Sequence, residues 1–288
     1  MPEEQEMGER HEPESRALRG YRLGSVWGVP IAVDWSLLVI FALVTFDLGA
    51  GVFPSWHPSW SPVVVWTTAF CAAVLFFGSL LLHELSHALM ARGFGIRVRG
   101  ITLFLFGGVT QLAREAGAPK TEFFVAIVGP LTSLVLGGTA WVIGMRTAGP
   151  ALGEAIANGD ANALSSALRD AGPLTTLLLW LGPINVTLAV FNLVPGFPLD
   201  GGRVFRALLW AITRDLERAT RWASLAGQAV ALGLIAWGVY AMVSGAFGSG
   251  LWLMLIGWFL NESARRSRAD VRAPDGARQR PVTAGRPS

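Results

Sequence analysis

Two histidines and a glutamate stand close together inside a long apolar stretch: His83, Glu84 and His87, in the pattern His-Glu-x-x-His. On a helix, residues four apart lie on one face, so both imidazoles can reach one ion, while the glutamate, about 100° round, can contact a water on that ion. Zinc suits such ligands and lowers the pKa of a bound water, whose proton the glutamate can take. The alternative is two buried histidines satisfied by neighbouring helices, which would be costly in hydrocarbon.

A catalytic zinc takes three protein ligands, so a third ligand is required. The other carboxylates in or near the apolar stretches are Asp34, Asp47, Glu122, Asp200 and Glu262. Asp200 stands apart because it lies in a Pro- and Gly-rich segment, residues 195–202, that must break the helix before it. Broken backbone at membrane depth is tolerated where it lines a wet cavity, so Asp200 is the candidate third ligand. The alternative is that its carboxylate caps a helix that begins near Gly201.

The composition is that of a polytopic membrane protein. Of 288 residues, 52% are hydrophobic and 15% are charged, whereas globular chains carry about 25% charge. The single cysteine, Cys71, excludes a disulfide framework or a cysteine-ligated metal site within one chain. The arginines flank apolar stretches and form no continuous basic face, which indicates a membrane partner and no nucleic acid.

The apolar stretches predict an all-α polytopic fold with about six transmembrane helices and a short membrane-embedded β-hairpin. The spans are expected at about 26–46, 62–92, 122–145 and 173–194, with two more, the last of them short, sharing 223–264. The hairpin is expected over 97–112, a solvent loop with a surface helix over 146–172, and an interfacial amphipathic helix over 203–222.

Three regions follow from these spans. Residues 1–25 are expected to be a cytoplasmic tail, 26–264 the transmembrane domain, and 265–288 a disordered cytoplasmic tail. With six crossings, all 23 lysines and arginines except Arg146 and Arg169 fall on one side of the membrane. The positive-inside rule therefore predicts that both termini are cytoplasmic.

Four segments resemble, in their order along the chain, the site-2 protease family of intramembrane zinc metalloproteases (family M50), in its prokaryotic six-span type. The segments are His-Glu-Leu-Ser-His at 83–87, Phe-Gly-Gly-Val at 106–109, Ala-Ile-Val-Gly-Pro at 126–130, and Asn-Leu-Val-Pro-Gly-Phe-Pro-Leu-Asp-Gly-Gly-Arg at 192–203. The resemblance covers about residues 25–215. The CBS pair that often follows this type is not visible in 265–288, and no gap between spans could hold a PDZ domain of about 90 residues.

The resemblance implies both an activity and a site. By resemblance, His83, His87 and Asp200 bind one Zn²⁺ per chain, Glu84 is the catalytic base, and Asn192 binds the substrate backbone or the oxyanion. The activity would be hydrolysis of a peptide bond within or near a transmembrane helix of a membrane-bound regulatory protein, such as an anti-sigma factor or a transcription-factor precursor. The partners implied are a transmembrane protein substrate and the lipid bilayer of the cell membrane.

The glycines of the expected hairpin, Gly107 and Gly108, have two interpretations. In a strand, glycine commonly marks a bulge or a close backbone approach, and a strand edge can pair with an extended substrate. Both residues are therefore candidates for substrate binding. The alternative is a tight hairpin turn inside the bundle. Gly129-Pro130 and Gly137-Gly138 are expected to be packing or kink positions of the third span.

Two other functions remain open from the residues alone. The same His, Glu and Asp cluster could be the transit site of a membrane metal transporter, although no second polar site along a path is visible. A non-catalytic membrane scaffold is the other alternative, which the intact Glu84 disfavours. Zinc content combined with a cleavage assay would separate the three.

Overall fold

The computed structural model describes residues 20–272. The strands are β1 (Tyr21–Val26), β2 (Val29–Val33), β3 (Val98–Phe104) and β4 (Gly107–Leu112). The helices are α1 (Trp35–Asp47), the π-helical η1 (Leu48–Val52), α2 (Phe53–Trp56), α3 (Pro62–Gly93), α4 (Pro119–Ala148), α5 (Pro150–Asn158), α6 (Ala161–Arg169), α7 (Pro173–Asn192), α8 (Asp200–Thr213), α9 (Leu216–Val243) and α10 (Phe247–Arg272). The tails expected at 1–25 and 265–288 lie mostly outside the described residues, with β1 beginning in the first and α10 ending in the second.

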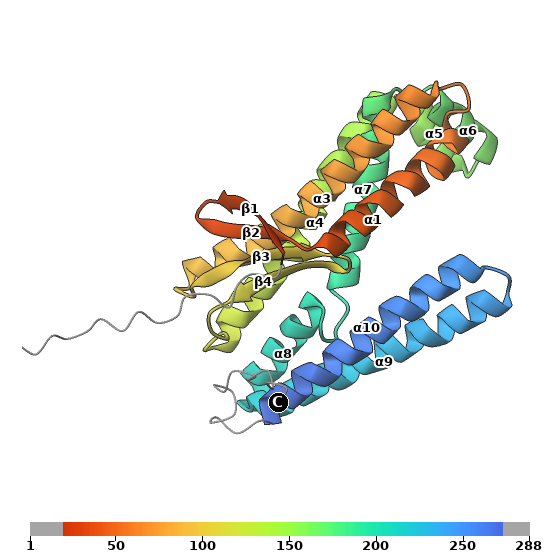
Figure 1. The fold of residues 1–288 in the computed structure, drawn as a ribbon. Coiled ribbons are helices and arrows are strands. Elements are labelled where there is room, and N and C mark those ends of the chain that lie inside the picture. Colours follow the sequence, from red (N-terminus) through yellow and green to blue (C-terminus); the bar gives the residue numbers. More distant parts are fainter. Residues whose placement is uncertain (1–19, 273–288) are drawn as a thin grey trace, which may run out of the picture.

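Five helical segments of the described residues are long and apolar enough to cross a membrane: α1 continued through η1 and α2, then α3, α4, α7 and α9. These are the five longer spans expected from the sequence. Helix α10 is not one of these five segments of the described residues, because its continuously apolar run is short. Figure 1 shows α10 running back along α9 as a helical hairpin, so a sixth crossing remains a prediction.

The strands form one sheet in the order β1-β2-β3-β4, in which β2 and β3 are parallel and the other pairs antiparallel. The β3–β4 pair confirms the hairpin expected over 97–112. The first span was wrongly expected to begin at 26, because a second hairpin, β1–β2, occupies residues 21–33. Helix α1 begins only after Asp34, whose Oδ1 accepts the backbone N–H of Ser36 at 2.9 Å as an N-cap.

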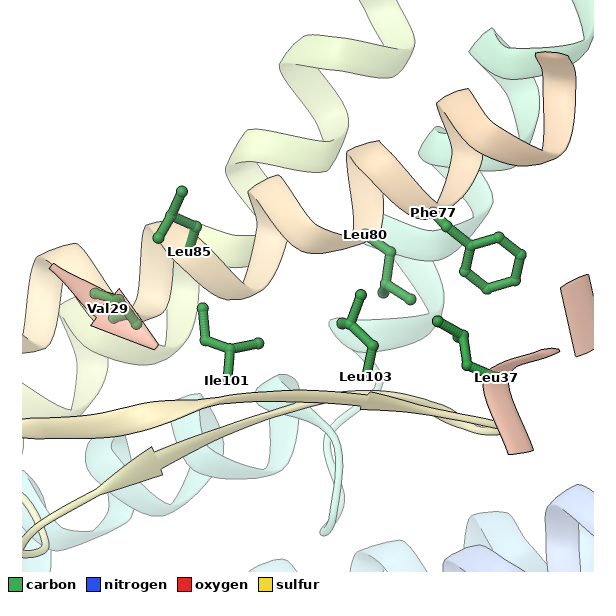
Figure 2. Close-up of a cluster of buried hydrophobic side chains, with 8 residues drawn as sticks. Val29, Leu37, Phe77, Leu80, Leu85, Ile101 and Leu103 are labelled. Atoms are coloured by element: carbon green, nitrogen blue, oxygen red, sulfur yellow. The ribbon is translucent and has the colours of Figure 1, made fainter. Parts of the chain in front are cut away.

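The sheet packs against the helix that carries His-Glu-x-x-His. A buried cluster joins the two, and its members are Val29, Leu37, Phe77, Leu80, Leu85, Ala88, Ile101 and Leu103. Figure 2 shows Leu80 of α3 directed toward Leu103 of β3, with Leu85 and Ile101 further along the same contact. Because both faces of this contact are apolar and buried, β3 is fixed on α3, and β4 lies beside the same helix.

Glycines bring α4 and α7 into close contact. A Cβ on Gly137 would lie 2.8 Å from the carbonyl oxygen of Gly182, and a Cβ on Gly182 would lie 2.9 Å from the backbone nitrogen of Trp141. Gly137 is therefore a packing position, as expected, whereas a Cβ on Gly138 would meet nothing within 4 Å among the described residues. Small residues allow membrane helices to approach in this way.

The segment 146–172 contains two short helices, α5 and α6, that lie at the end of the bundle far from the sheet (Figure 1). They also cover His57, which stands in a polar-looking stretch between two tryptophans, Trp56 and Trp60. His57 is 1% exposed and stacks on Trp60 with ring centroids 3.7 Å apart. Its Nε2 lies 2.8 Å from Thr176 Oγ1. The cover comes from residues more than 100 positions away, so the local sequence gave no sign of it.

The chain after α7 breaks at residues 193–199 and then forms α8 and α9. The interfacial helix expected over 203–222 is interrupted, because α8 ends at Thr213 and α9 begins at Leu216. The break itself is held by α9: Phe197 N–H donates to Ala223 O at 3.2 Å, and a Cβ on Gly227 would lie 2.8 Å from Phe197 N. This close backbone contact fixes the start of α8.

Candidate active site

The structure brings His83, His87 and Asp200 together. Both imidazole Nε2 atoms lie 3.1 Å from Oδ2 of Asp200, and one ligand atom from each residue lies within 4.8 Å of the others. Zinc bound by imidazole nitrogen and carboxylate oxygen at about 2.0–2.1 Å in tetrahedral geometry separates its ligands by about 3.3 Å. The donor set and its spacing therefore fit one zinc ion.

Two helices supply these ligands. His83 and His87 occupy one face of α3, as their four-residue spacing predicts, and are 2% and 3% exposed. Asp200 is the first residue of α8, whose N-cap is Leu199. In the described structure the Asp200 carboxylate makes no capping hydrogen bond and faces the imidazoles instead, so the capping alternative is not realised.

Helix α4 fixes the orientation of both imidazoles. His87 Nδ1 lies 2.5 Å from the carbonyl oxygen of Val125, and His83 Nδ1 lies 2.9 Å from Ser133 Oγ. A carbonyl can only accept, so His87 must carry its proton on Nδ1, which leaves the Nε2 lone pair free for a metal. A hydroxyl can accept in the same way from His83. Such partners set the tautomer of metal-binding histidines.

Gly129 lies between Val125 and Ser133 on the same face of α4. A Cβ at this position would collide with Nε2 of His87 and would lie 2.6 Å from Nε2 of His83. The third span was expected to use Gly129 for packing or a kink, and the structure shows that the group packed against it is the imidazole pair. The spacing of 125, 129 and 133 is the one signal in the sequence that could have grouped these residues.

Glu84 points from the same turn of α3 toward strand β4. Its Oε2 accepts a hydrogen bond from Thr110 Oγ1 at 2.7 Å, and the side chain is 8% exposed. A Cβ on Gly108 would lie 2.8 Å from Glu84 Cδ. Gly108 is therefore adjacent to the expected base. Gly107 has a φ of +130° at the hairpin turn, and a Cβ there would meet nothing within 4 Å among the described residues.

Asn192 ends α7, seven positions before the N-cap of α8. Its side-chain Nδ2 donates to the carbonyl oxygen of Leu188 on its own helix at 3.0 Å, and the residue is half-buried. Among the described residues, no hydrogen bond joins Asn192 to the three expected ligands. Its role in binding substrate or oxyanion stays a prediction.

A buried ion pair joins α8 to α4. Arg206 Nε donates to Glu122 Oε1 at 2.7 Å, Nη2 contacts the same oxygen, and the guanidinium lies 5.0 Å from the ring centroid of Phe197. Glu122 was one of the carboxylates open as a third ligand, and the structure assigns it to Arg206 instead. The pair holds the helix that begins with Asp200 against the helix that orients the imidazoles.

A bundle of apolar helices in which two histidines and an aspartate could hold one metal ion beside a glutamate is the arrangement expected of a metal-dependent hydrolase. The sequence profile of peptidase family M50 matches residues 71–234, and the chain belongs to that family. It is 39% identical over 271 residues to Rip3 of Mycobacterium tuberculosis, covering 91% of this chain and 64% of Rip3. It is 35% identical over 254 residues to sll0528 of Synechocystis, covering 88% of this chain and 61% of that protein.

The fold is also similar to a solved structure. The site-2 protease from Methanocaldococcus jannaschii superposes with a TM-score of 0.55 and 25% sequence identity, covering 86% of this chain and 94% of that one. The chain spans less than two thirds of the length of the two curated relatives it matches.

Proposed function

We propose that this protein is an intramembrane zinc metalloprotease that cleaves a peptide bond within or near a transmembrane helix of a membrane-bound regulatory protein. The observation that carries the proposal is Oδ2 of Asp200, 3.1 Å from Nε2 of both His83 and His87, with Glu84 in the same turn as the histidines. Membership of peptidase family M50 and the relative named zinc metalloprotease MJ0392, 27% identical over 222 residues, support it.

Each expected site residue has a distinct task in this proposal. His83, His87 and Asp200 would hold the metal; the Val125 carbonyl on α4 keeps His87 in the tautomer that ligation needs, and Ser133 on the same helix can accept a hydrogen bond from His83. Zinc held there would supply Lewis acidity toward the scissile carbonyl and would lower the pKa of a bound water. Glu84 would accept the proton of the attacking water and then give it to the departing amine nitrogen. Asn192 donates an N–H to the developing oxyanion.

Strand β4 is the expected docking element for the substrate. It is the last strand in the order of the described sheet, so one edge carries backbone groups without a strand neighbour. An extended peptide gains main-chain hydrogen bonds by adding to such an edge. Gly108 leaves the hairpin without a side chain beside Glu84, and Gly107 leaves its turn open, so a substrate backbone could come close to the reacting groups.

The membrane orientation follows from charge. Both termini are proposed to be cytoplasmic in a multi-pass protein of the cell membrane, since 21 of the 23 lysines and arginines then lie on that side. The site would lie toward the cytoplasmic half, because His87 precedes Arg92 at the end of α3 by little more than one turn. Water would then reach the metal from the cytoplasm.

The test combines metal content with cleavage. Purified protein is reconstituted with a single-span membrane substrate, and Glu84→Gln is compared with Glu262→Gln, a carboxylate paired at the surface with Arg266. Glu84→Gln is expected to keep its zinc and lose cleavage, while Glu262→Gln keeps both. Full cleavage by Glu84→Gln would refute the assignment. Zinc flux into liposomes without peptide cleavage would favour a transporter, for which family membership gives no support.

A further inference from the structure

One face of strand β4 lies against the side chain of Glu84. Residues two apart in a strand point to the same face, and Gly108 and Thr110 both meet Glu84, while Val109 between them is 46% exposed. Thr110 Oγ1 lies 2.7 Å from Glu84 Oε2 and 3.1 Å from the carbonyl oxygen of Glu84. The threonine therefore contacts both the side chain and the backbone of the residue.

Gly108 closes the other side of the same space. A Cβ at this position would lie 2.8 Å from Glu84 Cδ and 2.9 Å from Oε1. The two glycines of the hairpin thus differ, because Gly107 has open space and an unusual φ, whereas Gly108 makes room for the carboxylate. The carboxylate of Glu84 therefore lies between the backbone of Gly108 and the hydroxyl group of Thr110, which donates a hydrogen bond to it.

The two carboxylate oxygens of Glu84 differ in their hydrogen bonding. Oε2 is occupied by the Thr110 hydroxyl, and among the hydrogen bonds of the described residues none engages Oε1. A glutamate side chain has several rotatable bonds, and a general base works only within hydrogen-bond reach of the proton it accepts. A donor on Oε2 fixes those bonds and leaves Oε1 as the acceptor for the water's proton.

We propose that Thr110 is a positioning residue for the general base Glu84, which it holds by a hydrogen bond to Oε2, with Gly108 providing the space. The inference rests on the proposed protease function, because it assigns a task to a neighbour of the base. It also gives β4 a second task beside substrate docking.

The proposal is tested with variants of two threonines in the same sheet, Thr110 and Thr102. Thr110→Val removes the hydroxyl at nearly constant volume, and Thr110→Ser keeps it. The matched control is Thr102→Val, since Thr102 lies on the neighbouring strand opposite Val109 and its buried Oγ1 has no hydrogen-bond partner among the described residues. Cleavage of the reconstituted substrate is measured as kcat and KM, and zinc is measured by elemental analysis.

Thr110→Val is expected to lower kcat by about tenfold or more, as for partners of catalytic ligands, with KM and zinc content unchanged. Thr110→Ser is expected to recover most of the loss, and Thr102→Val to behave as wild type. Equal kcat for Thr110→Val and Thr102→Val would overturn the proposal, and so would a Thr110→Ser defect as large as that of valine. If the valine variant does not fold, Thr110→Ala against Thr110→Ser decides in the same way. Absence of cleavage by the wild type would instead refute the proposed function.

Discussion

Gly129→Ala should empty the metal site without unfolding the protein. The added Cβ would lie 2.6 Å from His83 Nε2 and 2.6 Å from His87 Cε1, and it would collide with His87 Nε2. Ordinary van der Waals contact begins at 3.4 Å, so each imidazole must move by about 0.8 Å or more. The three atoms nearest to the added Cβ all belong to imidazole side chains, so the strain falls first on the ligands and not on the packing of the helices.

A displacement of this size is large for a metal ligand. Ligand distances in a functional zinc site hold to within about 0.2 Å, and even a lost partner of a ligand costs about 10–100-fold in affinity. Gly129→Ala is therefore expected to weaken zinc binding by at least about 100-fold. Cleavage should fall with it.

Zinc affinity is measured by competition with a chromogenic chelator on detergent-solubilised protein, alongside a thermal unfolding scan of the metal-free form. Gly138→Ala is the matched control, since it changes the same residue type on the same helix where a Cβ meets nothing within 4 Å among the described residues. The control should bind zinc as wild type does. Wild-type zinc affinity in Gly129→Ala would refute the geometry described for α4.

Two further predictions concern stability. Glu122→Ala leaves the buried guanidinium of Arg206 unpaired and should lower the free energy of unfolding by about 3–5 kcal/mol. The double variant Glu122→Leu with Arg206→Met should recover much of that loss. Denaturant unfolding in detergent measures both, and an unchanged midpoint in Glu122→Ala would contradict the pairing. Burial lowers the pKa of His57 below its ordinary value of 6.5, against a smaller raising effect of a backbone hydrogen bond. The unfolded chain then binds the proton more tightly, so stability should fall as pH drops below 6.5. His57→Gln should flatten that dependence in Tm measured from pH 7.5 to 5, and an unaltered slope would count against it.

Much of the fold was predictable because membrane spans and helical motifs are local signals. The five longer spans follow from runs of apolar residues, and the shared face of His83 and His87 follows from helical periodicity. Asp200 was predictable as a candidate metal ligand because a helix break at membrane depth is tolerated where it lines a wet cavity. Which oxygen meets the imidazoles was not predictable, since it depends on how α8 packs on α4.

The rest depended on contacts between distant segments. Ser133 and Thr110 are ordinary residues in sequence, and each gains its task only from the element packed against it. The first hairpin was missed because the apolar residues of β2 are separated from the apolar run of α1 by Asp34 alone. The burial of His57 likewise depends on α6 and α7, which contact both of its ring nitrogens from more than 100 residues away.

The position of Asp200 has a mechanical consequence. It lies 113 residues beyond His87, at the start of the segment that leads into the α9–α10 hairpin, which Figure 1 shows extending apart from the α1–α7 bundle. An ion shared between α3 and α8 is therefore a cross-link between the bundle and this C-terminal segment. Its binding free energy would add to that of the Glu122–Arg206 pair in joining them, so the metal proposed for the chemistry would also stabilise the fold.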